Sequence, residues 1–276
     1  MTLLSGQGAG RNGVRDEETP LLGQRPLKRT RRNRMTDKLG SSWTDAVLLA
    51  CYIVTGLLDS ASIQVWGTFV SMQTGNTVYV GLGLASLATT APGPRLYKSA
   101  LSIASFCLGS FIFARFHRIF SPRRRWVLCA SFAAQALLTV AAAVIVGVYP
   151  PGPDTGDLAW NVLVPIMLMA FQSCGQAVAS RALRQDALIS VVLTSAYCDL
   201  FSDRDLFALD NVPRNQRAAG PLLLLLGVVW GGLFAHGSIG IVGALWAAAG
   251  LKFGMVIAWF LWPTAGEDED EDEAWI

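Results

Sequence analysis

The chain has 276 residues, of which 52% are hydrophobic and 15% are charged, and its formal net charge is +2. That charged fraction lies well below the roughly 25% that is usual for soluble domains. Long uncharged apolar runs therefore exclude an ordinary soluble domain and predict an all-α integral membrane protein.

The first 40 residues are polar, glycine-rich and basic, which predicts a disordered tail. Its positive charge favours a cytoplasmic N-terminus and contact with anionic membrane lipid. Within the tail, Glu17, Leu21 and Leu22 form an acidic dileucine pattern, which resembles a sorting signal of eukaryotic vacuolar and endosomal proteins. This pattern predicts a sorting adaptor as a partner and a plasma, vacuolar or endosomal membrane as the location. A solvated tail without a signal is the alternative.

Six apolar runs are long enough to cross a bilayer, at about residues 44–64, 96–116, 126–148, 160–180, 218–235 and 239–262. They lie in a predicted membrane domain over residues 41–263. Residues 264–276 follow as an acidic tail, which we expect to be disordered and solvated.

Two further apolar segments, residues 66–89 and 187–202, complicate the count of crossings. The basic tail and the basic residues of 115–125 both favour the cytoplasm, yet three apolar segments separate them. Residues 181–184 and 204–217 also favour the cytoplasm, with one segment between them. Both conflicts disappear if the two further segments are re-entrant or broken, the first opening outside and the second inside. Eight full spans are the alternative.

Residues 70–76 align loosely with residues 190–196, at an offset of 120 residues. The same order of elements, namely a span, a short polar segment and two spans, recurs in the halves 44–148 and 159–262. With three crossings in each half, the halves would be inverted relative to each other. Inverted repeats with discontinuous helices are typical of transporters and channels.

The segment after the first span has a polar centre at membrane depth, formed by Gln73, Thr74, Gly75 and Asn76. Polar residues within a membrane-spanning region are functional by default, so we expect a solute or ion pathway here. Thr194 occupies the matching place in the second half. A packing seam of small residues between helices is the alternative.

Two ionisable residues lie inside apolar spans, Asp59 in the first and Lys252 in the last. Their estimated depths are near enough for the side chains to meet, so Lys252 is one candidate partner of Asp59. The pair would serve as a proton or cation relay, or as an anchor for a solute. A purely structural pair is the alternative.

Gln172, Gln176 and Ser180 recur at four-residue spacing and share one helix face. Such a polar stripe faces either a pore or another helix, and both interpretations stay open. Gln135, a lone polar residue in its span, predicts a hydrogen bond between helices.

The sequence shows no pattern of metal ligands, no nucleophile with a general base and no basic nucleic-acid surface. The five cysteines and two histidines are dispersed, at positions 51, 107, 129, 174 and 198 and at 117 and 236. We therefore expect no enzyme activity, no metal, no cofactor and no nucleic-acid partner.

The Gln-Thr-Gly-Asn block and its surroundings are similar to the YoaK-like family of uncharacterised membrane proteins, also called domain of unknown function 1275. The resemblance rests on residues 56–60, 67–76, 170–177 and 192–194. It covers about residues 45–262 and implies about six spans, but it implies no activity. The chain departs from the family at Ser195 and Ala196, where the family tends to have Thr-Gly.

Together these patterns predict a transporter or channel for an unknown small solute or ion, with a polar site near the midplane. A scaffold or regulator that transports nothing and works through its tails is the alternative.

Overall fold

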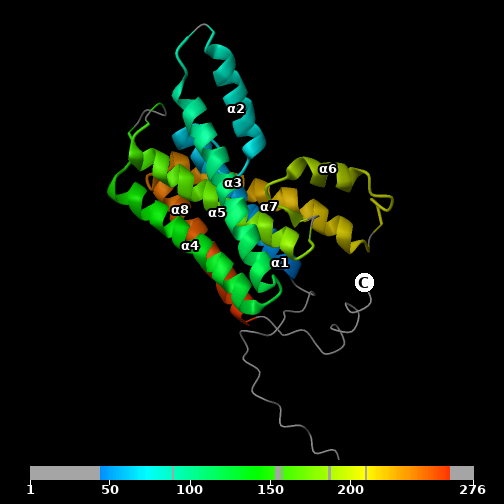
Figure 1. Ribbon diagram of the computed structural model, residues 1–276. Helices are drawn as coiled ribbons and strands as arrows, with labels where there is room; N and C mark the ends of the chain where they lie inside the picture. The colour runs from blue at the N-terminus through cyan, green and yellow to red at the C-terminus, as the bar shows by residue number, and fades with distance from the viewer. Residues whose placement is uncertain are drawn as a thin grey trace, which may run out of the picture. The chain divides into compact units, whose positions relative to one another are not determined.

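The computed structural model describes residues 44–88, 90–152, 156, 158–185, 188–208 and 210–261, all within the unit Asn33–Ile276. The predicted sorting signal at Glu17, Leu21 and Leu22 and both predicted tails lie outside the described residues. The described part is helical and has no strand (Figure 1). Its helices are α1 (Thr44–Trp66), α2 (Gln73–Ser86), α3 (Pro94–Phe120), α4 (Arg125–Val148), α5 (Trp160–Ala182), α6 (Leu193–Phe201), α7 (Val212–His236) and α8 (Gly240–Leu261).

Six of these helices are long and apolar enough to cross a membrane, namely α1, α3, α4, α5, α7 and α8. The other two are short, with 14 residues in α2 and 9 in α6. At 1.5 Å per residue they reach about 21 Å and about 14 Å, less than the roughly 30 Å of the hydrocarbon core. The chain is therefore an all-α integral membrane protein by length and composition, and six spans fit it better than eight.

The long helices begin and end close to the predicted boundaries, with one clear difference in α7. This helix begins at Val212, within the charged residues 204–217, whereas the predicted span begins at about residue 218. The reason is local, because Asn211 caps the helix by accepting a hydrogen bond from the backbone N–H of Arg214 at 3.0 Å. Pro213 in the first turn also favours a helix start.

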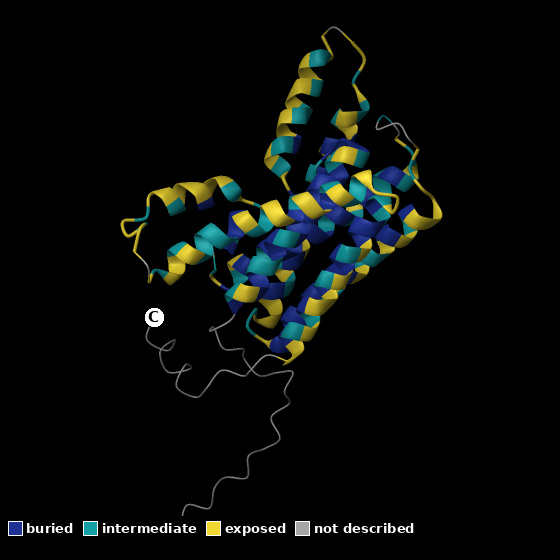
Figure 2. Ribbon diagram, turned by 180° about the vertical axis from the view of Figure 1, so that it is seen from behind, coloured by how far each residue is buried: buried dark blue, intermediate teal, exposed yellow. Residues whose placement is uncertain are grey.

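The long helices pack as three extensive pairs, α1 with α7, α3 with α5, and α4 with α8. The short helices lie outside this arrangement, α2 beside α3 and α6 beside α7 (Figure 1). Buried residues gather where the long helices pack together, whereas the short helices are mostly exposed (Figure 2).

Glycines allow α1 and α7 to approach at backbone distance. A Cβ atom at Gly56 would lie 2.1 Å from the carbonyl oxygen of Leu224, and one at Gly227 would lie 2.1 Å from that of Ile53. Contacts between small residues of this kind are a common way to pack membrane helices, since the lipid offers no hydrophobic driving force for association.

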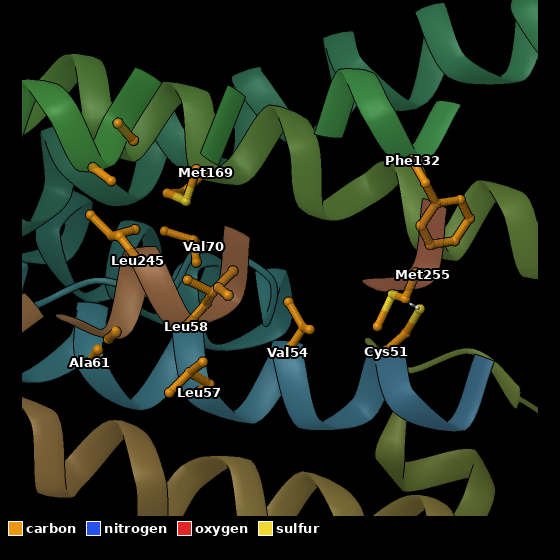
Figure 3. Packing of buried hydrophobic residues seen from close by; sticks show 14 of the residues in the cluster. Cys51, Val54, Leu57, Leu58, Ala61, Val70, Phe132, Met169, Leu245 and Met255 are labelled. Atoms are coloured by element: carbon orange, nitrogen blue, oxygen red, sulfur yellow. Dashed lines mark hydrogen bonds between the residues drawn. The ribbon is translucent and has the colours of Figure 1, made fainter. Parts of the chain in front are cut away.

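The loop between α1 and α2 contributes a residue to the apolar core. Val70, from the loop between α1 and α2, is fully buried in the cluster of core residues. It lies near Leu58 of α1, Met169 of α5 and Leu245 of α8 (Figure 3). The chain after α1 therefore turns back into the centre of the helix bundle.

We expect Gly227→Ala to destabilise the protein by about 1–3 kcal/mol, because the added methyl group forces α1 and α7 apart. Gly250→Ala is the matched control, since a Cβ atom there would meet no atom within 4 Å. This control should leave stability unchanged or raise it by up to about 1 kcal/mol through helix propensity. The apparent melting temperature of the detergent-purified variants measures both effects. Equal melting temperatures would contradict the close contact.

Candidate functional site

The bundle has two interrupted segments: the first is the loop of residues 67–72 with α2, and the second is residues 188–192 with α6. The first begins where α1 ends. Gly67 has a φ of +73°, a left-handed conformation that favours glycine. The chain turns there and runs back as a non-helical loop over residues 67–72 before α2 begins. Backbone N–H and C=O groups at membrane depth need partners inside the protein, so the loop depends on nearby side chains.

Asp59 of α1 supplies most of these partners. Its Oδ1 accepts hydrogen bonds from the backbone N–H groups of Val70 and Ser71, at 2.9 and 2.8 Å. Its Oδ2 accepts from the N–H of Met72 at 3.1 Å. From the opposite side, Ser173 of α5 donates its hydroxyl to the carbonyl oxygen of Val70 at 2.9 Å. The carboxylate thus anchors three successive residues of the loop.

Asn76, in the first turns of α2, holds the other end of the same loop. Its Oδ1 accepts from the hydroxyl of Thr68 at 2.8 Å and from the N–H of Phe69 at 3.1 Å. Its Nδ2 donates to the carbonyl oxygen of Phe69 at 2.8 Å, and also to Gln73 and Ser102. The side chain is fully buried and makes bonds with both its oxygen and its nitrogen.

Gly75 of α2 allows the loop to pack against the helix, because a Cβ atom there would lie 2.7 Å from the ring of Phe69. Asn76 and Gly75 therefore brace the loop, and neither lines the cavity described below.

The second interrupted segment is anchored in a similar way, through residues 188–192 ahead of α6. Gln176 of α5 donates through Nε2 to the hydroxyl oxygens of Thr55, at 2.5 Å, and of Ser190, at 2.9 Å. Ser180 of α5 donates to the carbonyl oxygen of Leu188 at 3.0 Å. In this way α1 and α5 each contribute side chains to both interrupted segments.

Lys252 of α8, the candidate partner of Asp59, does not pair with it. Its Nζ donates to the amide oxygens of Gln135, at 2.6 Å, and Gln176, at 3.2 Å. The estimate of depth gave the height of each charge but not the direction in which each side chain points. The predicted hydrogen bond of Gln135 between helices is confirmed.

The remaining predicted residues differ in burial and in their hydrogen-bond partners. Gln172 is fully buried in α5, and neither its amide oxygen nor its nitrogen has a hydrogen-bond partner. Thr194 lies exposed at the start of α6 and does not line the cavity. In the polar stripe of α5, Gln176 and Ser180 brace the second segment, so their part of the stripe faces protein.

A cavity of about 550 Å³ lies where the two interrupted segments come together. Ser71, Gln73 and Thr74 line it from the first segment, and Val191 and Val192 line it from the second. Residues of α3 and α5 and of the turn after α3 form the rest of its wall: Phe106, Ser110, Ala114, His117, Arg118, Pro122, Ala177, Val178, Arg181 and Ala182. Of the predicted pathway residues, only Gln73 and Thr74 therefore reach the cavity.

Sequence reasoning missed the basic side of this cavity. Arg118 and Arg181 follow apolar spans, and such residues indicate which side of the membrane a loop occupies. The same residues line the cavity together with the buried His117. The only signal in the sequence was that both arginines come near the C-terminal ends of spans that also carry polar residues.

No group of three or more His, Cys, Asp or Glu side chains in the described ranges is placed to hold a metal ion. The polar groups of this region instead form hydrogen bonds with loop backbone or line the cavity.

A family model described as "Protein of unknown function (DUF1275)" matches residues 47–258, which is most of the chain. Comparison with curated proteins and with solved structures finds no match. The matched range spans both interrupted segments and the cavity between them.

We expect Asp59→Leu to destabilise the protein by about 3 kcal/mol or more, because three N–H groups, two of them buried, lose their acceptor. Asp59→Asn keeps one carbonyl oxygen and should lose less stability. Thermal unfolding of the detergent-purified variants gives the ranking. An unchanged melting temperature for Asp59→Leu would show that the carboxylate is not the anchor of the loop.

Proposed function

This chain belongs to the DUF1275 family, whose description assigns no activity, and we propose that it carries a small solute across the membrane through the cavity between its two interrupted segments. The observation that carries the proposal is the meeting of both segments at one cavity in a bundle of six candidate spans. Non-helical backbone at membrane depth is tolerated where it is buried in protein or lines a cavity.

We also propose an internal repeat, which would favour transport. The helices α2 and α6 begin at Gln73 and Leu193, which keeps the offset of 120 residues. Each has one buried residue, Asn76 in α2 and Ala196 in α6, again at this offset. The two short helices thus occupy equivalent places in the two halves.

The packing of the long helices supports the same repeat. In this repeat, α1 corresponds to α5, α3 to α7 and α4 to α8. When each helix is exchanged with its counterpart, the pair α1–α7 becomes α5–α3, and the pair α4–α8 is unchanged. The close contacts follow the exchange, because Gly109 faces the carbonyl oxygen of Phe171 as Gly227 faces that of Ile53. Gly227 follows Gly109 by 118 residues, and Phe171 follows Ile53 by the same number.

Each half contributes three long helices and one short helix. Since three is odd, the halves would have opposite orientations in the membrane, and α2 and α6 would open toward opposite faces. Transporters with inverted repeats bind their substrate near the midplane, where discontinuous helices meet, and alternate between two openings.

The second segment is the better candidate for the moving part. The first loop is held by Asp59 and by the buried amide of Asn76. The position equivalent to Asn76 is Ala196, which has no polar side chain. In place of such anchors, the described residues 188–192 have the hydrogen bonds of the Ser190 hydroxyl with α1 and α5 and that of the Leu188 carbonyl oxygen with α5.

Thr74→Trp should abolish solute movement, because the indole would project into the cavity and obstruct it, while Thr77→Trp on the same exposed helix should not. The measurement is stopped-flow light scattering of proteoliposomes against a panel of small neutral, cationic and anionic organic solutes. Thr77 does not line the cavity, so it controls for the size of the new side chain. If folded wild-type protein moves no solute faster than empty liposomes, the transport proposal fails and the scaffold remains.

The orientation we propose places the turn at Ser121 in the cytoplasm and the turn at Ser238 outside, because basic residues surround the first. Both serines are exposed. In a cysteine-free background in cells, a membrane-impermeant maleimide should label Ser238→Cys directly and Ser121→Cys only after permeabilisation. The reverse pattern would invert the topology.

A further inference from the structure

The charged groups that line the cavity are all basic. Arg118 of α3 and Arg181 of α5 lie on its wall with exposed side chains, and the imidazole of His117 lies beside them. No carboxylate from the described residues lines the cavity. A cavity with two guanidinium groups and no opposing acid favours an anionic occupant.

Two buried polar groups in the wall lack partners. Ser71 is 2% exposed and its Oγ has no hydrogen-bond partner, although its N–H is bonded to Asp59. His117 is 2% exposed, with Nε2 3.2 Å from the hydroxyl of Ser131 and Nδ1 without a partner. When Ser131 donates this bond, Nδ1 carries the ring proton. Both residues line the cavity, so its wall contains two buried polar groups whose hydrogen-bonding capacity is unused in the described part of the chain.

The two short helices add to the same preference. Gln73 and Thr74, in the first turn of α2, line the cavity, and so do Val191 and Val192 just before α6. The N-terminal end of a helix carries a partial positive charge and unpaired N–H groups, which favour anions.

We propose that this cavity binds a small organic anion, a carboxylate or phosphate with an apolar body. The apolar body would contact Phe106, Ala114 and Val178, which line the wall with the polar groups. In taking this anion as the solute that is moved, the inference rests on the proposed function. Binding itself does not depend on transport.

Calorimetric titration of the full chain in nanodiscs of neutral phosphatidylcholine tests the proposal, with benzoate and phenyl phosphate as probes. Benzamide is the neutral analogue, and we expect at least one anion to bind about tenfold more tightly than it does. Arg118→Gln and Arg181→Gln should each weaken binding about tenfold. Arg115→Gln is the matched control, because Arg115 lies exposed on α3 and does not line the cavity. Equal binding of anions and benzamide, or no binding by folded protein, would overturn the proposal.

The same titration in nanodiscs with anionic phosphatidylglycerol identifies the source of the anion. Weaker probe binding there would indicate a lipid headgroup as the natural occupant, and unchanged binding would indicate a free solute. Either result keeps the anionic chemistry. Anion binding without solute movement in liposomes would remove the transport proposal alone, whereas movement of neutral solutes without anion binding would remove this inference alone.

Discussion

The structure depends on the partners of a backbone that leaves the helical conformation in the centre of a helix bundle. A loop in this place has N–H and C=O groups that neither water nor lipid can satisfy. Asp59 accepts hydrogen bonds from three successive N–H groups of the first loop, and Ser173 donates to one of its carbonyl oxygens. These bonds allow Val70 to occupy the apolar core, so the interruption is part of the packing.

The glycine contacts between helices act together with the hydrogen bonds that hold the interrupted segments. Gly56 and Gly227 bring α1 and α7 to backbone distance, and Gly109 does the same for α3 and α5. The helices α1 and α5, which hold the two interrupted segments, are therefore each fixed against a partner from the other half. The cavity lies between segments that this packing keeps in place.

Much of the fold was predictable from the sequence, because the length of each apolar run shows whether it can span a bilayer. The polar centre around Gln73 and Asn76 was also predictable, since such residues are rare at this depth. The true partners of Asp59 and Lys252 were not predictable, because spacing along a helix gives height without direction. The roles of Arg118 and Arg181 were hidden as well, since a basic residue at the end of a span has a sufficient explanation in topology.

The amide of Gln176 connects parts of the molecule that are distant in sequence. Its oxygen accepts from Lys252 of α8, and its nitrogen donates to Ser190 of the second segment. The acceptor oxygen and the donor nitrogen of an amide belong to one rigid planar group, so they move together. A rotation that releases the lysine therefore also withdraws the donor from the serine, so the last helix and the second loop are mechanically coupled through one side chain.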